Sequence, residues 1–97
     1  MIRMRVSREI RGEVVARAGC GLPWETTLAG LDQAVFPMLG ALDPHADAVF
    51  NGRQIPALIA ELDRLPAERG GEWVAEVRAL CEAVSRGPAH YILFIGD

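Results

Sequence analysis

The sequence predicts an α+β domain in which about four strands form one sheet and two main helices cover one face of it. Apolar, strand-like stretches stand at both ends of the chain, and two segments in its second half show helical spacing of apolar residues. Pro and Gly separate these segments. A length of 97 residues is enough for one core, so the chain is expected to be a single domain over 1–97.

The N-terminal segment is expected to form a β-hairpin. Apolar side chains alternate there with polar ones, which is the period of a strand with one face in water: Ile2, Met4, Val6. After a polar bend, 13–18 is again extended and contains two β-branched valines. The segment 24–35 has apolar residues at helical spacing, which indicates a short helix despite its Thr and Gly residues.

The segment 36–42 is predicted to be the third strand, because it is short, apolar and bounded by Pro37 and Pro44. Beyond it, a turn is expected to begin at Asp43 and Pro44. The third strand would thus stand directly before the most polar segment of the chain.

A helix is predicted over about 54–65. Asn51 is followed three residues later by Gln54, a spacing that resembles a capping box. Pro56 leaves the start open between position 54 and Pro56 itself, because a proline ring fits only the first turn. One side of this helix is apolar, and the other would turn Glu61, Asp63 and Arg64 outward.

A second main helix is predicted over 71–86, with a wide apolar stripe and a stop at Gly87-Pro88. The C-terminal strand over 90–95 is apolar from Tyr91 to Ile95, which indicates an interior strand covered on both faces. Because the two helices would cover only one face of the sheet, a homodimer or another protein is expected to cover the other.

Composition excludes several functions. The chain is 51% hydrophobic and 24% charged with a net charge of −3, as in a globular protein, and no apolar run approaches the length of a membrane span. Without lysine, Schiff-base chemistry and a phosphate-loop lysine are excluded. The arginines are scattered and outnumbered by 13 acidic residues, which argues against nucleic acid. A cytoplasmic protein without membrane contact is the expectation, with Cys20 and Cys81 unpaired.

Two blocks of sequence resemble an uncharacterised family of short bacterial proteins with no known activity. The first block is Asp43-Pro44, Asp47, Val49-Phe50-Asn51, Gln54, Pro56 and Glu61-Leu62. The second is His90-Tyr91 with Phe94-Ile95-Gly96-Asp97. The resemblance covers about a third of the chain, does not include His45, and implies no function.

One segment, from Asp43 to Gln54, holds most of the chemically capable side chains. A metal or acid/base site would need Asp43, His45 and Asp47 to converge, with His90 or Asp97 brought near by the sheet. In the alternative interpretation Asp43 starts a turn, Asp47 closes it and Asn51 caps a helix. No catalytic residue, metal or cofactor is assigned. The candidate functional loop consists of Asp43, His45, Asp47, Asn51, Arg53 and Gln54, together with His90.

The absence of a nucleophile elbow or a paired-cysteine motif favours a protein that is not an enzyme. The leading hypothesis is a small cytoplasmic protein-interaction module, an accessory, regulatory or immunity-type partner of another protein. The alternative is a small enzyme or a ligand- or metal-binding protein that uses the candidate functional loop.

Overall fold

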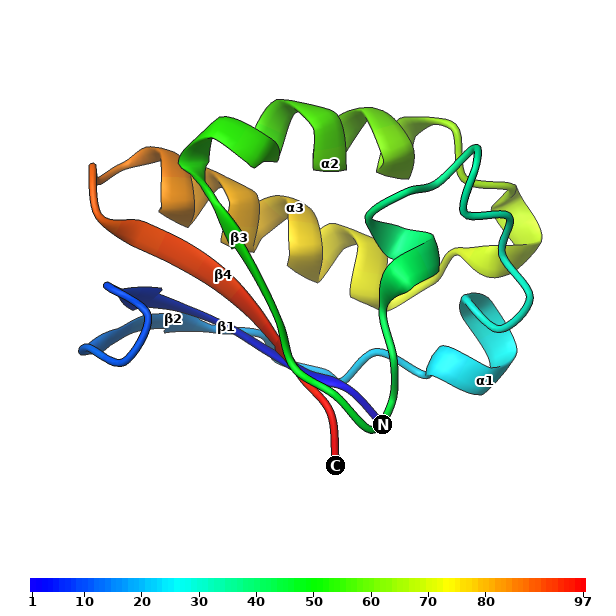
Figure 1. Ribbon diagram of the computed structural model, residues 1–97, viewed down its shortest axis with the longest axis horizontal. Helices are drawn as coiled ribbons and strands as arrows, with labels where there is room; N and C mark the ends of the chain where they lie inside the picture. The colour runs from blue at the N-terminus through cyan, green and yellow to red at the C-terminus, as the bar shows by residue number, and fades with distance from the viewer.

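A computed structural model describes all residues, 1–97, and its centre is a four-stranded antiparallel sheet (Figure 1). The strands are β1 (Arg3–Arg8), β2 (Val14–Arg17), β3 (Ala48–Asn51) and β4 (His90–Ile95). Their order across the sheet is β2-β1-β4-β3, so the two terminal strands are the central ones. The chain therefore closes its sheet by pairing its first strand with its last.

The two main helices, α2 (Ile55–Asp63) and α3 (Glu72–Ser85), lie on one face of the sheet (Figure 1). A single helical turn, α1 (Trp24–Thr27), stands at one end of this layer. Three short 3-10 turns complete the elements: η1 (Leu39–Ala41), η2 (Gly52–Gln54) and η3 (Ala67–Arg69). No helix is both long and apolar enough to cross a membrane.

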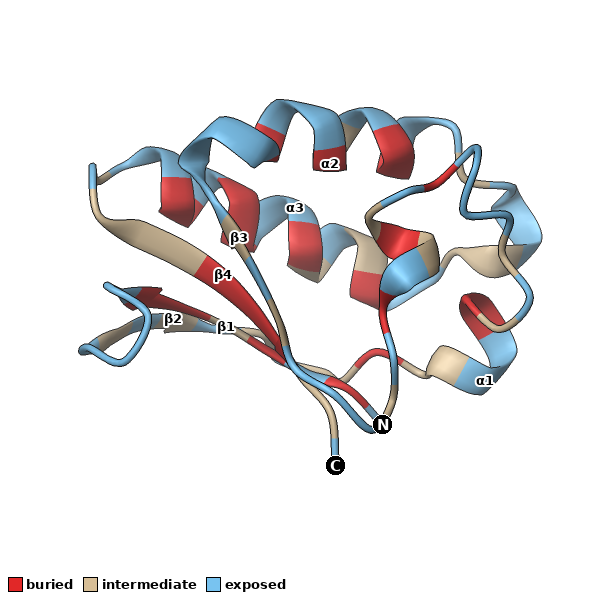
Figure 2. Cartoon of the chain, viewed as in Figure 1, coloured by how far each residue is buried: buried red, intermediate tan, exposed pale blue.

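The hydrophobic core lies between the sheet and the helices, where buried residues gather on the facing sides of both layers (Figure 2). Val6, Ile92 and Phe94 supply the sheet side, and Trp73 and Val77 supply part of the helix side, all at most 2% exposed. Even-numbered residues of β1 and β4 therefore point to the helices. Because side chains alternate along a strand, the odd-numbered residues point to the opposite face.

The α+β class is confirmed, and so are most of the expected elements. β1 and β2 form the N-terminal hairpin, with a bulge between Val6 and Ser7. The helices predicted over 54–65 and 71–86 are observed as α2 and α3, and the C-terminal strand is observed over the predicted residues 90–95. These elements have apolar periodicity along their own length, which is why sequence alone identifies them.

The third strand predicted over 36–42 is wrong. That segment consists of turns and η1, and it is fixed by the carboxylate of Glu61 on α2. The backbone N–H groups of Met38 and Leu39 donate to this carboxylate at distances of 2.9 to 3.2 Å. Glu61 is 1% exposed, so its predicted outward orientation is also wrong. The apolar residues of 36–42 are buried in a turn rather than in a strand.

The prediction of a helix over 24–35 is also wrong beyond the first turn. α1 ends at Thr27, and Gly30 has a φ of 75°, a conformation that a helix does not allow. The carboxylate of Asp32 then accepts a hydrogen bond from the backbone N–H of Ala34 at 2.9 Å, which forms a local turn. The apolar residues of this segment contact the core from an irregular stretch of chain, so their spacing does not indicate a helix.

Candidate functional site

The candidate loop contains the third strand that the sequence reasoning missed. β3 pairs with β4 in antiparallel register, with Phe50 opposite Ile92 and Ala48 opposite Phe94. The rings of Phe50 and Phe94 meet edge to face, with centroids 5.8 Å apart. The middle of the loop is thus an edge strand, and only its two flanks are turns.

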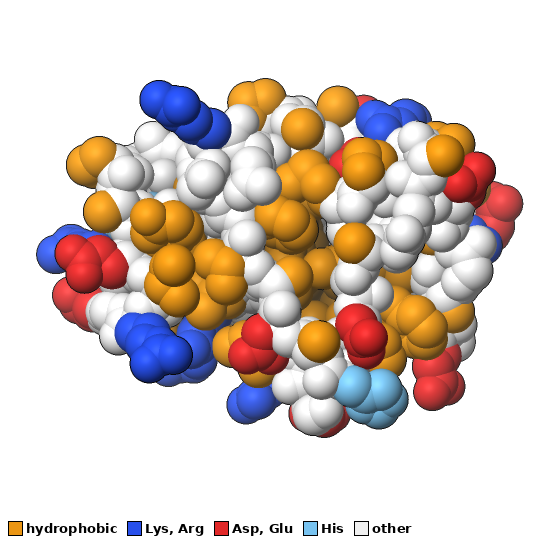
Figure 3. All heavy atoms as spheres, viewed as in Figure 1, with side chains coloured by type: hydrophobic (Ala, Val, Ile, Leu, Met, Phe, Trp, Pro, Cys, Tyr) orange, Lys and Arg blue, Asp and Glu red, His pale blue; other side chains and the backbone are white.

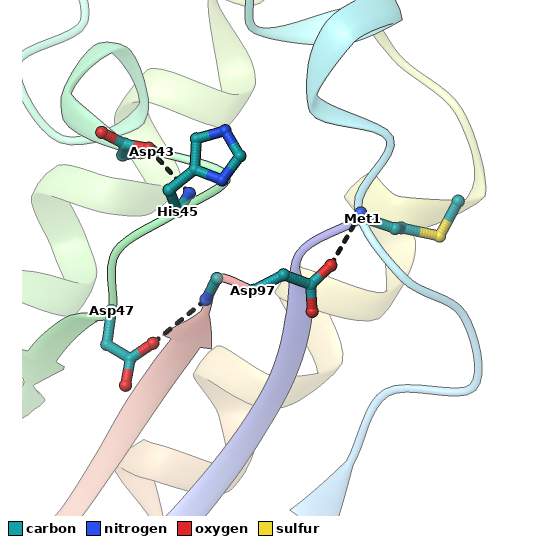
Figure 4. Close-up of polar contacts among 6 residues, drawn as sticks. Met1, Asp43, His45, Asp47 and Asp97 are labelled. Carbon is teal, nitrogen blue, oxygen red and sulfur yellow. Dashed lines mark hydrogen bonds and ion pairs between the residues drawn. The ribbon is translucent and has the colours of Figure 1, made fainter.

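Asp43 and His45 form a local turn before β3. The carboxylate of Asp43 accepts a hydrogen bond from the backbone N–H of His45 at 2.7 Å. The ring of His45 is exposed and takes part in no hydrogen bond or ion pair (Figure 4). Asp43 therefore uses its side chain as turn-forming aspartates commonly do.

Asp47 and the neighbouring loop hold the end of β4. The carboxylate of Asp47 accepts a hydrogen bond from the N–H of Gly96 at 3.1 Å (Figure 4). The N–H of Asp97 donates to the carbonyl of Pro44 at 2.8 Å. A side chain at Gly96 would place its Cβ 2.5 Å from the backbone nitrogen of Ala46, so only glycine permits this approach.

Asn51 and Gln54 form the predicted capping box. The side-chain oxygen of Asn51 accepts from the N–H groups of Arg53 and Gln54, and the Gln54 side chain accepts from the N–H of Asn51 at 2.8 Å. The box begins η2, and α2 follows at Ile55 with Pro56 in its first turn. The side chain of Arg53 is exposed and unpaired.

His90 lies at the opposite end of β4 from Asp47. Its Nδ1 is 3.0 Å from the carbonyl oxygen of Ala83 in α3. The six residue steps from His90 to Gly96 span about 20 Å in an extended strand, so His90 is far from Asp47. The carboxylate of Asp97 turns instead to the N-terminal amine of Met1, at 3.6 Å (Figure 4). No group of three or more His, Cys, Asp or Glu side chains could hold a metal ion.

The two sequence blocks, 43–62 and 90–97, meet in space. The first block contains the Asp43 turn, Asp47 and β3, and the second contains β4 with Gly96 and Asp97. Strand pairing and the hydrogen bond from Gly96 to Asp47 join them. The two blocks thus form one structural unit, in which the polar residues of the first block position the end of the last strand.

The sheet has a second face, which no helix covers (Figure 1). We call this the outer face; register and side-chain alternation give its members. They are Arg3, Arg5 and Ser7 of β1, Arg17 of β2, Val49 and Asn51 of β3, and Tyr91, Leu93 and Ile95 of β4. Sequence reasoning treated the arginines as scattered, although the alternation over 2–7 already indicated that Arg3 and Arg5 share one face.

No family model, curated protein or solved structure matches the chain. Function must therefore be inferred from the geometry itself. That geometry gives a structural use to the side chains of Asp43, Asp47, Asn51 and Gln54 and leaves the outer face without one.

Proposed function

We propose that this protein is a small, non-enzymatic, cytoplasmic interaction module, an accessory, regulatory or immunity-type protein, whose outer face binds another protein. The observation that supports the proposal most directly is the one-sided cover of the sheet. An antiparallel sheet with one solvated face normally shows polar residues on that face. Here the outward positions of β4 are all apolar or aromatic.

The apolar part of the outer face runs along β4 and onto β3. Tyr91, Leu93 and Ile95 alternate along β4, and Val49 lies opposite Leu93. Leu93 is only 7% exposed, while Val49 is 36% exposed. Figure 3 shows hydrophobic side chains gathered beside β3 and over β4, with arginine side chains below them. The accessible part of this patch is therefore Val49 with the half-buried Tyr91 and Ile95. An apolar patch with a charged border is typical of a protein-binding site.

The charges on the outer face favour a partner other than a second copy. Arg3, Arg5 and Arg17 carry positive charge, and no strand residue of this face is acidic. In a two-fold dimer both surfaces are the same, so these arginines would meet no free carboxylate on the second copy. A partner with an apolar patch bordered by Asp or Glu fits better.

The proposal is tested by comparing wild type with Val49→Asp, which places a charge at the most exposed position of the apolar surface. Val35→Asp is the matched control, because Val35 is exposed outside the sheet. The proteins are used to capture partners from the cell of origin, and sedimentation measures their size. We expect one acidic protein to bind wild type and the control, to release at raised salt, and to be lost with Val49→Asp.

Two results would contradict this assignment. The first is equal capture by all three proteins, since binding would then not involve the outer face. The second is a stable dimer of wild type that Val49→Asp dissociates, which would show that a second copy covers the sheet.

A further inference from the structure

A pocket of about 290 Å³ opens between the N-terminal hairpin and the chain that leaves it. Arg3, Arg5 and Arg17 line it together with the backbone of Gly19–Gly21. Ile95 contributes an apolar side at the end of β4. None of the residues of the candidate functional loop belongs to this pocket, so it is a separate feature of the fold.

The three arginines are close neighbours because of strand register. Arg5 lies directly opposite Arg17 across the hairpin, and Arg3 is two residues away on the same face. Like charges directly opposite on antiparallel strands destabilise the pair. None of the three has a carboxylate within ion-pair distance, because the only ion pairs join Arg78 to Asp63 and the N-terminal amine to Asp97.

The pocket also contains hydrogen-bond donors without acceptors. The Nε of Arg5 is buried and has no partner, the only buried side-chain nitrogen or oxygen in this state. The backbone N–H groups of Gly19, Cys20 and Gly21 donate to no backbone or side-chain acceptor. A buried donor without an acceptor is unfavourable, so the Nε of Arg5 lacks a partner that a ligand in the pocket could supply. The amides of Gly19–Gly21 lie on exposed or half-buried residues and are free to donate to the same ligand.

Acidic groups near the pocket do not fill this role. Asp47 directly precedes β3 and Asp97 follows β4, but their carboxylates are bonded to the N–H of Gly96 and to the N-terminal amine. Glu76 on α3 approaches Gly19 from outside the lining. Burial raises the pKa of the Cys20 thiol, and the charges of Glu76 and Glu72 add to this, so the thiol is not activated as a nucleophile.

We infer that this pocket binds one oxyanion group, a carboxylate or a phosphate, between Arg3, Arg5 and Arg17. The guanidinium groups supply charge-assisted donors with the geometry that such groups need. An oxyanion between Arg5 and Arg17 replaces their repulsion by two attractions. The volume exceeds that of the anion alone, which leaves room for a short organic body against Ile95. The pocket shares Ile95 and the three arginines with the outer face, but binding of an oxyanion there does not require that the apolar surface binds a protein.

The test uses the isolated protein and inorganic phosphate as the probe, with chloride at equal ionic strength as the reference. Amide resonances of Gly19–Gly21 are followed by NMR during the titration. We expect saturable shifts at these amides in wild type. Arg17 is exposed, so Arg17→Gln should leave the fold intact. Arg5→Gln removes the buried donor. Each substitution should weaken phosphate binding at least tenfold.

Arg11→Gln is the matched control, because it removes the same charge from an exposed turn outside the pocket. Retained affinity in Arg11→Gln together with tenfold losses in the two pocket variants supports the site. Equal losses in all three variants would indicate nonspecific attraction by net charge and would overturn it. Absence of saturable shifts with every probe would also overturn it.

Two further probes distinguish the source of the oxyanion. Glutarate represents a free small acid, and a short end-blocked peptide with one Glu represents an acidic side chain of a protein. If phosphate or glutarate produces saturable amide shifts that disappear in the pocket variants, the site binds small molecules. Saturation by the peptide alone assigns it to the side chain of a protein partner. In both cases the same three arginines bind the oxyanion.

Discussion

Glu61 shows how one buried side chain decides the path of a distant segment. It is on α2, yet its carboxylate accepts the backbone N–H groups of Met38 and Leu39, which lie more than twenty residues earlier in the chain. A buried carboxylate is unfavourable unless hydrogen bonds satisfy it. Arg64, one turn further along, donates to the carbonyl of Val35 and lies 5.2 Å from the ring centroid of Phe36. Together the two side chains attach the 35–39 segment to α2.

Glu61→Ala is therefore expected to lower the free energy of unfolding by about 2–3 kcal/mol, because it leaves the buried N–H of Leu39 and the partly buried N–H of Met38 without an acceptor. Glu61→Gln, which keeps one acceptor oxygen, should lose about half as much. Urea denaturation measures both, with the exposed Glu82→Ala as the control. Equal stability of Glu61→Ala and Glu82→Ala would contradict the assigned role.

At the scale of elements, sequence periodicity identified β1, β4, α2 and α3, because each element shows its apolar pattern within its own length. β3 was missed because four residues between turn formers carry little pattern, and its stability depends on pairing with β4, some forty residues away. The segment 36–42 was misassigned because an apolar strand and a buried turn have similar composition. The contact of this segment with Glu61 could not be predicted from local sequence, because its partners are 22 and 23 residues apart.

The candidate site divides in the same way. The capping box of Asn51 and Gln54 was predictable, because both partners lie within one turn of chain. The hydrogen bond from Gly96 to Asp47 was not, since 49 residues separate its partners. The grouping of Arg3 and Arg5 with Arg17 required the hairpin register, which depends on a bulge that the sequence does not reveal.

The junction of β4 with the loop before β3 predicts a specific sensitivity at Gly96. In Gly96→Ala the new Cβ would lie 2.5 to 2.8 Å from backbone atoms of Ala46 and Pro44, which cannot turn aside as a side chain does. We expect a loss of about 1–3 kcal/mol in stability from overpacking. Gly52→Ala is the control, because its nearest neighbour would be Val84 at 4.0 Å. Denaturation curves compare the two, and similar losses would refute the tight junction.

At the scale of the whole molecule, the absence of lysine simplifies the alkaline pH dependence of stability. Without lysine, the two thiols of Cys20 and Cys81 stand out, because the fold raises the pKa of each above its ordinary value. Cys81 is 1% exposed in the core, and burial raises the pKa of its thiol from 9.0 to about 11, although Arg78 opposes this rise. The folded state favours the neutral thiol more than the unfolded chain does. The contribution of this thiol to the free energy of unfolding is therefore complete below pH 9 and disappears toward pH 11.

The molecule should therefore lose on the order of 2–3 kcal/mol of stability between about pH 9 and pH 11 through Cys81. A Cys20→Ala background removes the other thiol, and chemical denaturation at several pH values measures the slope. Adding Cys81→Ala should flatten the slope even though it lowers stability at neutral pH. An unchanged slope in the double variant would show that Cys81 is not responsible.

The pairing of the first strand with the last has a mechanical consequence. Arg3 lies opposite Ile95, so both ends of the chain leave the middle of the sheet at the same end of its strands. Tension applied between the two ends loads the hydrogen bonds of β1 and β4 one pair after another, beginning at Arg3 and Ile95. Strands arranged in this way separate one hydrogen bond at a time instead of breaking all their bonds together. The force needed to unfold the protein from its two ends should therefore be low, although the loaded strands are the two central ones.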